Sequence, residues 1–446
     1  MKDMTQGNPI KLILGFAIPM LIGNIFQQIY NVVDTIIVGR YLGEDALAGV
    51  GSTGTLTFFL LALVGGLCNG AGLVVAQCVG CKDTDKLKKS VVALIWTSGI
   101  MTIIISILGL CCSRFFLKIL SVPDNVMEYS VEYLRIIFIF ALGSVAYNGA
   151  SSILRSTGDS KTPLIALIAG SILNVVLDIV LIVNFDMGVA GAAYATVISQ
   201  ILSAIICIAY LVAKRKAIGL TNINWFPDKN STLLIIKTGF PAAFQSCMIS
   251  LGGMSVQRLV NSYGSSVMAA YVAANRIDSV AIQVIVSIGT ALSVFAGQNI
   301  GQDNFKRIHE ALRKTLVMMM VASISIAAIV LIFRFQLMSV FLDSETSVEA
   351  TSIGATYLSI IGIAYVIAGI MQSYQNVIRG AGDVNACMVA GLTELAGRIV
   401  FAYLLAVFFN LGPTGIWIAT PISWGCGCVI PVIRYYSGKW KTKKLV

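Results

Sequence analysis

The chain has 446 residues, of which 57% are hydrophobic and 12% are charged. Soluble globular domains contain roughly 45–50% apolar and about 25% charged residues, so this composition excludes an ordinary soluble protein. The formal net charge is +10, and only the positions of the basic residues can decide whether that charge serves a nucleic-acid partner.

Apolar runs long enough to cross a hydrocarbon core of about 30 Å recur along the whole chain. The first run is too long for the core of a signal peptide and lacks a small-residue cleavage site, so we expect it to remain as a membrane helix. The sequence therefore predicts an all-α polytopic membrane protein. Its twelve predicted transmembrane helices lie at 12–38, 47–79, 90–111, 131–150, 163–183, 189–213, 233–261, 267–298, 315–335, 353–378, 385–409 and 414–435.

The basic residues gather in alternate loops. When the N-terminus is placed in the cytoplasm, the outer loops hold only Arg40, Arg114, Lys118 and Arg334. The inner segments hold most of the others, including Lys82, Lys86, Lys88, Lys89, Lys214, Arg215, Lys216, Lys306, Arg307, Arg313, Lys314 and four lysines of the C-terminal tail. The positive-inside rule then predicts two cytoplasmic termini. We expect a multi-pass protein of the bacterial cytoplasmic (inner) membrane and no nucleic-acid partner.

The cysteines do not indicate a metal site. The chain has ten, most of them inside predicted helices, and Cys78 and Cys81 form a CxxC pair. His309 is the only histidine of the sequence, and no second cysteine pair has the spacing of a zinc site. We interpret the cysteines as small buried apolar residues.

The second half of the chain repeats the first. "AQCVG" (76–80) returns as "GQNIG" (297–301), "LRSTGD" (154–159) as "IRGAGD" (378–383), and "GVAGAAYATVIS" (188–199) as "GPTGIWIATPIS" (412–423). Six helices per repeat is an even number, so the two repeats enter the membrane in the same direction. The sequence predicts two parallel six-helix lobes, 1–213 and 232–446, with a basic tail on the second, joined by a cytoplasmic linker at 214–231.

Polar residues at membrane depth distinguish the two repeats. Asn174 and Asp178 lie four residues apart and share one helix face. A charge at the bilayer centre costs about 2.5–3.5 kcal/mol by insertion scales, which makes an unpaired carboxylate there a functional-site hypothesis. Asp34 in the first predicted helix and Thr196 in the sixth lie at similar depth. In the second repeat, Asn174 and Asp178 correspond to Arg398 and Ala402.

Two interpretations of these four residues remain open from chemistry alone. Carboxylate, amide and hydroxyl oxygens are hard ligands that suit Na⁺, and two neighbouring buried carboxyls can instead share a proton. In both cases the site would hold a coupling cation, with Na⁺ as the only metal ion considered. The alternative is a structural hydrogen-bond network that joins the three helices.

The rest of the sequence offers no catalytic set. No GxxxxGK[ST] phosphate loop occurs, so we expect neither an enzyme nor a bound cofactor. Glu394 and Arg398 are spaced i,i+4 and predict a structural ion pair, with substrate contact as the alternative. The run "VMMMV" (317–321), which includes Met318, is interpreted as packing, with a permissive drug-binding surface as the alternative.

The sequence resembles the multidrug and toxic compound extrusion (MATE) family of cation-coupled antiporters. The resemblance covers essentially the whole chain. It depends on "IPMLIGNIFQQIYNVVDTIIVGRYLGEDALAGVG" (18–51), "AQCVG", "ILRSTGDSKTPL" (153–164), "NVVLD" (174–178) and "GVAGAAYATVIS". It implies a V-shaped pair of six-helix bundles that alternates between inward- and outward-facing states.

The resemblance also implies a function and a site. Family members export amphipathic, often cationic, organic compounds against an inward flow of H⁺ or Na⁺, and so confer drug resistance. The family's cation site maps onto Asp34, Asn174, Asp178 and Thr196. We expect Gln27, Asn31, Glu394, Arg398 and Met318 at the substrate cavity, membrane lipids as the surroundings, and a monomeric protein.

One departure and two alternatives accompany the resemblance. A branch of the family also uses acids in the second half, whereas the predicted helices at 233–261 and 353–378 contain no acid here. The pattern is closer to the branch with small-drug and dye exporters of Gram-positive bacteria. A flippase for a lipid-linked precursor would favour a cationic cavity and often has fourteen helices. A channel or membrane-embedded enzyme is disfavoured by the asymmetric polar residues and the missing catalytic set.

Overall fold

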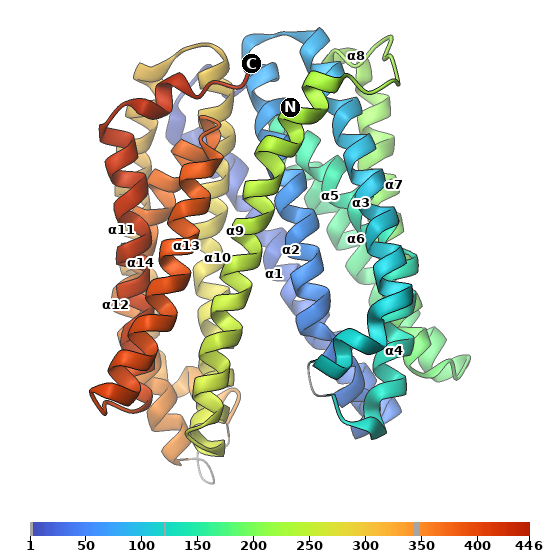
Figure 1. The fold of residues 1–446 in the computed structure, drawn as a ribbon, viewed down its shortest axis with the longest axis vertical. Coiled ribbons are helices and arrows are strands. Elements are labelled where there is room, and N and C mark those ends of the chain that lie inside the picture. The colour runs from blue at the N-terminus through green and yellow to red at the C-terminus, as the bar shows by residue number, and fades with distance from the viewer. Residues whose placement is uncertain (1–2, 120–121, 343–347) are drawn as a thin grey trace. The chain divides into compact units, whose positions relative to one another are not determined.

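The computed structural model describes residues 3–119, 122–342 and 348–446, and these residues form helices and connections without a β-strand (Figure 1). The helices are α1 (Pro9–Leu42), α2 (Glu44–Cys81), α3 (Thr84–Ile119), α4 (Asp124–Ile139), α5 (Ala141–Ser156), α6 (Lys161–Asp178), the π-helix η1 (Ile179–Asn184), α7 (Gly188–Ala213), α8 (Arg215–Ile218), α9 (Lys229–Asn261), α10 (Ser265–Gly301), α11 (Phe305–Ser339), α12 (Val348–Gly380), α13 (Val384–Tyr403), the π-helix η2 (Leu404–Phe408), α14 (Pro413–Tyr436) and the 3₁₀-helix η3 (Lys439–Thr442).

The number of membrane spans agrees with the sequence. Within the described ranges, eleven helices are long and apolar enough to cross a bilayer, and the number rises to twelve if the bent pair α4 and α5 is one span. That pair, which the sequence predicts as a single run at 131–150, is bent by 49°. The bend lies at Phe140, whose φ of −100° and ψ of 20° depart from helical values. No proline marks this point, so hydropathy alone does not reveal the break.

The chain forms two compact units. The first consists mainly of Pro19–Ala243, and the second of Met4–Ile18 and Phe244–Leu445. Helices α1 and α9 therefore each begin in one unit and end in the other. Both contain an interior proline next to the division, Pro19 and Pro241. A proline lacks the N–H of a helical hydrogen bond, so each helix can bend where it passes between units.

The internal repeat is visible in local structure. In the first unit α6 runs into the π-helix η1 and then α7, and in the second unit α13 runs into η2 and then α14. The loops before α6 and α13 each contain a glycine with positive φ, 85° at Gly158 and 94° at Gly382. Such a conformation favours glycine, which explains why both copies of the "GD" motif place glycine there.

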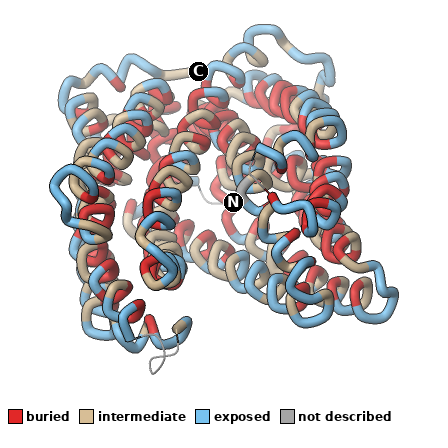
Figure 2. Tube along the Cα trace, turned by 60° about the horizontal axis from the view of Figure 1, so that its bottom comes forward, coloured by how far each residue is buried: buried red, intermediate tan, exposed pale blue. Residues whose placement is uncertain are grey.

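The helices bury an apolar core and also expose many large apolar side chains. Buried and exposed positions alternate along the helices (Figure 2). Ile103, Phe115 and Ile165 are among the exposed side chains, each more than 60% accessible. An apolar exterior is stable only against hydrocarbon, and this pattern indicates a polytopic membrane protein.

Close helix packing predicts a specific stability defect in the second unit. A Cβ added to Gly415 in α14 would lie 2.6 Å from the backbone nitrogen of Ala406 in η2. Backbone atoms cannot move aside without cost, so we expect Gly415→Ala to destabilise the protein by about 1–3 kcal/mol. Thermal unfolding of the purified protein in detergent would show a lower midpoint.

Gly425 on the same helix is the matched control, because a Cβ there would meet nothing within 4 Å. Gly425→Ala should therefore leave the midpoint unchanged or raise it slightly. Equal midpoints for the two variants would contradict the packing argument.

Candidate functional site

Two carboxyl groups face each other inside the first unit. Asp34 on α1 and Asp178 at the end of α6 lie within hydrogen-bonding range of each other. Asp178 is fully buried. Neither of its oxygens, nor Asp34 Oδ1, receives a hydrogen bond from an N–H or O–H group of the described residues. Two ionised carboxylates in this position would repel each other, and a shared proton or a bound cation would relieve that repulsion.

Asn174 extends this pair along α6. It lies one turn before Asp178 and is 1% exposed, and its amide oxygen and nitrogen also have no hydrogen-bond partner among the described residues. Buried polar atoms in proteins are nearly always paired, so three neighbouring side chains with unpaired oxygens call for a ligand. The predicted residues Asn174 and Asp178 therefore share one face, as their spacing indicates.

Thr196 and a tyrosine complete the polar surroundings. The hydroxyl of Tyr133 on α4 lies within hydrogen-bonding reach of the Thr196 side chain on α7. An apolar cluster of buried side chains packs among the same helices; it includes Ile37, Val38, Ile136, Ile182, Val189 and Val197. Charges are poorly screened in such surroundings, so the protonation or cation occupancy of the acids has large energetic consequences.

The π-helix η1 follows directly after Asp178. Single π-turns often occur at functional sites. However, η2 occupies the matching place in the second unit, where the residue that corresponds to Asp178 is the buried Ala402. The π-turn is therefore a property of the repeated fold, and the acid is what differs between the two copies.

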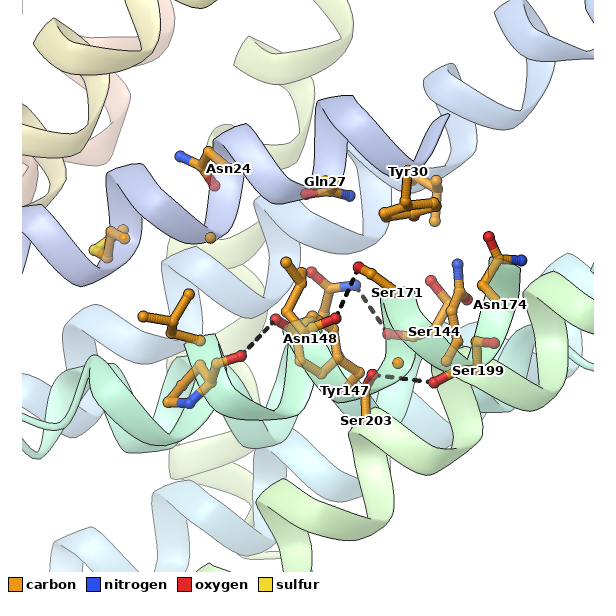
Figure 3. Close-up of a pocket in the computed structure, with 18 of the residues that line it drawn as sticks. Asn24, Gln27, Tyr30, Ser144, Tyr147, Asn148, Ser171, Asn174, Ser199 and Ser203 are labelled. Carbon is orange, nitrogen blue, oxygen red and sulfur yellow. Dashed lines mark hydrogen bonds between the residues drawn. The ribbon is translucent and has the colours of Figure 1, made fainter. Parts of the chain in front are cut away.

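Two cavities adjoin these residues. The first, of about 220 Å³, is shown in Figure 3 and is lined by Gln27, Tyr30, Ser144, Tyr147, Asn148, Asn174, Thr196 and Ser199, among others. The second, of about 140 Å³, is lined by residues that include Tyr30, Asn31, Asp34, Tyr133 and Thr196. Tyr30 and Thr196 line both. Asp178 lines neither.

The structure brings the four predicted cation-site residues together and separates the predicted cavity residues. Gln27 lines the first cavity and Asn31 the second. Glu394 and Arg398 lie on α13 in the second unit, where Arg398 Nη2 is 2.9 Å from Glu394 Oε1, so the predicted ion pair is present. Met318 lies half-buried on α11 and lines neither cavity.

A second buried acid in the other unit has different surroundings. Asp278 on α10 accepts hydrogen bonds from the hydroxyls of Tyr365, at 2.8 Å, and Tyr357, at 3.4 Å. Hydroxyl donors stabilise a carboxylate, so this acid has the partners that Asp34 and Asp178 lack. The sequence does not reveal it as a buried group with partners, because its two tyrosines are about eighty positions away in the chain.

The donor set fits a proton or a cation with oxygen ligands. The unpaired atoms include one oxygen of Asp34, two of Asp178 and one of Asn174, and oxygen ligands favour hard cations. Within the described residues, no three His, Cys, Asp or Glu side chains converge as a metal cluster. A transition-metal centre is therefore not indicated by the part of the chain that the structure describes.

Three residues at the cavities are not singled out by the sequence pattern. Tyr30 and Tyr133 lie beside the acids, and Arg155 lines the first cavity with its Nε unpaired among the described residues. Tyr30 precedes Asp34 by four positions, so its place on the same helix face was available from spacing. Tyr133 and Arg155 belong to α4 and α5, whose rotation toward the site depends on packing and on the bend at Phe140.

The comparisons with known proteins agree with this architecture. The MatE family model matches residues 19–180 and 241–404, once in each half. A probable multidrug resistance protein of Bacillus subtilis, YpnP, is 30% identical, with 99% of this chain and 98% of that protein covered. A second one, YoeA, is 29% identical, with 96% and 94% covered.

The fold is likewise similar to solved structures. One is described as the outward-facing conformation of a multidrug resistance MATE family transporter of the MOP superfamily. It has a TM-score of 0.90 at 25% identity, with 100% of this chain and 99% of that chain covered. The chain has an all-α fold with two repeated halves, and the family model matches both halves. It belongs to the MatE family of membrane transporters.

Proposed function

We propose that this protein is a cation-coupled antiporter that exports amphipathic, cationic organic compounds, with Asp34, Asn174, Asp178 and Thr196 as its coupling site. The observation that supports this most is the apposed pair Asp34 and Asp178 without a hydrogen-bond donor. The relatives named as multidrug resistance proteins support the substrate class. Members of this family are transporters and not enzymes.

The cycle follows from the energetics of the acid pair. With H⁺ or Na⁺ bound, the pair is neutralised and α1, α6 and α7 can pack closely. When the cation leaves, the two carboxylates repel each other and the helices move to an arrangement with more hydration. A substrate that prefers the second arrangement promotes cation release, and by reciprocity the cation promotes substrate release.

The substrate would bind where an uncompensated acid faces apolar and aromatic surface. Asp34 lines the second cavity together with Tyr30, Tyr133 and Leu60. Once its cation has left, Asp34 offers a negative charge to a cationic head group beside aromatic faces that also favour cations. Gln27 and Asn31, one turn apart on α1, would contact the polar parts of such a compound.

The proposal includes the arrangement in the membrane. Both termini and the linker at 214–231 would lie in the cytoplasm, because these segments carry clustered lysines and arginines. The protein would work as a monomer in the bacterial cytoplasmic membrane, with lobes at 1–213 and 232–446.

Replacing the buried acid should abolish coupling. In inside-out vesicles containing purified protein, we expect an imposed H⁺ or Na⁺ gradient to drive uptake of a cationic dye. Since coupling free energies are about 1–3 kcal/mol, Asp178→Asn should reduce this gradient-driven uptake about tenfold or more. Dye fluorescence with each gradient applied separately also identifies the cation.

Asp186→Asn is the matched control for this experiment. Asp186 is exposed in the loop after η1 and has a φ of 51°, which asparagine tolerates. It should transport as the wild type does. If Asp178→Asn responds to the gradient like this control, the acid pair is structural and the proposal is wrong.

The coupling cation should also stabilise the folded protein. A ligand that binds only the folded state adds about 2.7 kcal/mol of stability at 100 times its Kd. We expect either NaCl, compared with choline chloride at equal ionic strength, or acidification to raise the thermal unfolding midpoint of the wild type. Asp178→Asn should lose that response, and an unchanged response would argue against a cation at this position.

Cavity residues should affect substrate affinity without removing coupling. Gln27→Ala and Asn31→Ala each delete polar groups at the cavities and leave the acid pair intact. We expect the KM for dye uptake to rise several-fold while the same gradient still drives transport. Met318→Ala, outside both cavities, serves as the comparison, and a larger effect there would move the substrate site to the second unit.

A further inference from the structure

A third cavity in the first unit lies apart from the acid pair. It is a groove of about 780 Å³ between α3, α5 and α7, closed at one end by α8 and the segment 220–225. Its walls are apolar and include Leu94, Ile95, Leu142, Ile153, Ile208 and Leu211. The volume falls within the range of roughly 300–1,000 Å³ that holds a small organic ligand.

Two glycines keep the groove open. Gly99 on α3 and Gly149 on α5 both line it, and a Cβ on either would meet nothing within 4 Å. Elsewhere in the same unit glycines allow close helix contact; a Cβ on Gly109 would collide with Phe138 at 2.2 Å. Gly99 and Gly149 instead leave space for a ligand that is not part of the chain.

The mouth of the groove is cationic. Arg215 and Lys216 line it, both are exposed, and neither takes part in an ion pair among the described residues. The lining contains no acidic residue. Gly219, with a φ of 85°, closes the turn after α8, and Leu220 N–H donates to the carbonyl of Arg215 at 2.7 Å. The chain thus holds both cations at one end of an apolar slot.

Two tryptophans lie near this end of the groove. The indole Nε1 of Trp96 donates a hydrogen bond to the carbonyl of Trp225 at 2.9 Å. Trp96 is 48% exposed and Trp225 is 60% exposed. Tryptophans concentrate where hydrocarbon meets head groups. An apolar slot with two cations and a tryptophan at one end matches the two ends of a phospholipid.

We infer that this groove is a binding site for an anionic phospholipid, with an acyl chain between α3, α5 and α7 and the phosphate on Arg215 and Lys216. Basic pockets between membrane helices at the cytoplasmic face recognise such head groups. A cationic drug would meet two like charges at the mouth and no acid, so the groove is not a second copy of the proposed substrate site.

The location gives such a lipid access to the transport machinery. Val145 on α5 lines both the groove and the cavity that contains Asp34, while Ser144 and Asn148 on the same helix line the first cavity. An acyl chain in the groove would therefore pack against one side of α5, while other residues of α5 line the cavities of the candidate site. This inference concerns binding alone and does not depend on the proposed antiport.

Tryptophan quenching tests the site directly. The full chain would be reconstituted in dioleoylphosphatidylcholine vesicles with increasing amounts of dibrominated phosphatidylglycerol, or of dibrominated phosphatidylcholine as reference. Bromine on the acyl chain quenches a nearby indole; Trp225 lines the groove, and Trp96 donates a hydrogen bond to its carbonyl. We expect phosphatidylglycerol to quench the wild type at a much lower mole fraction than phosphatidylcholine does.

Two variants separate the head-group contact from the chain contact. Arg215→Gln with Lys216→Gln should weaken the preference for phosphatidylglycerol about tenfold or more, since each basic residue near a membrane surface contributes about a fivefold factor. Gly99→Leu with Gly149→Leu should fill the groove and reduce quenching by both lipids. Lys214→Gln, an adjacent exposed lysine that does not line the groove, should behave as the wild type.

The outcomes decide the inference without reference to transport. No preference for phosphatidylglycerol in the wild type, or the same loss of preference in Lys214→Gln as in the double variant, would overturn it. The inference would also be overturned if both lipids quenched the groove-filled variant (Gly99→Leu with Gly149→Leu) as strongly as they quench the wild type. This outcome counts only if the variant's gel-filtration profile and unfolding midpoint show a folded protein. Arg215 and Lys216 are on the exposed surface, so the variant that replaces both with Gln should fold. It still tests the inference if the groove-filled variant does not fold.

Discussion

The proposed coupling depends on the electrostatic repulsion between two buried acids that no donor among the described residues offsets. Asp34 and Asp178 approach each other inside the first unit, and no hydrogen-bond donor of the described residues reaches the three buried oxygens involved. A buried carboxylate without a donor or counter-charge is costly, so a bound proton or cation would stabilise the folded arrangement. In the proposed cycle a proton or a small cation neutralises the pair, and this step would link helix packing to an ion gradient.

In the second unit, by contrast, the buried acids have partners within the protein. Asp278 accepts hydrogen bonds from two tyrosines, and Glu394 pairs with Arg398 at 2.9 Å. Both arrangements satisfy the charge within the protein. The two repeats thus share helices, π-turns and glycine loops, and differ in whether their buried acids have partners.

The first unit also contains the groove inferred to bind a membrane lipid. Most exposed apolar side chains need only hydrocarbon around them. The groove behind α5 is different, because open glycine positions and a cationic mouth define a slot for one kind of lipid. Helix α5 thereby lies between a lipid contact and the cavity that contains Ser144 and Asn148.

The sequence by itself determined the spans, the repeat and the candidate acids. Hydropathy reports the spans because lipid requires long apolar helices, and the four-residue spacing of Asn174 and Asp178 places both on one face in any helix. Only the tertiary structure decided that Asp34 meets Asp178 without a donor, that Asp278 has two tyrosine partners, and that α4 and α5 break at Phe140. These outcomes depend on the rotation and packing of helices distant in the chain, and local periodicity carries no information about which faces finally meet.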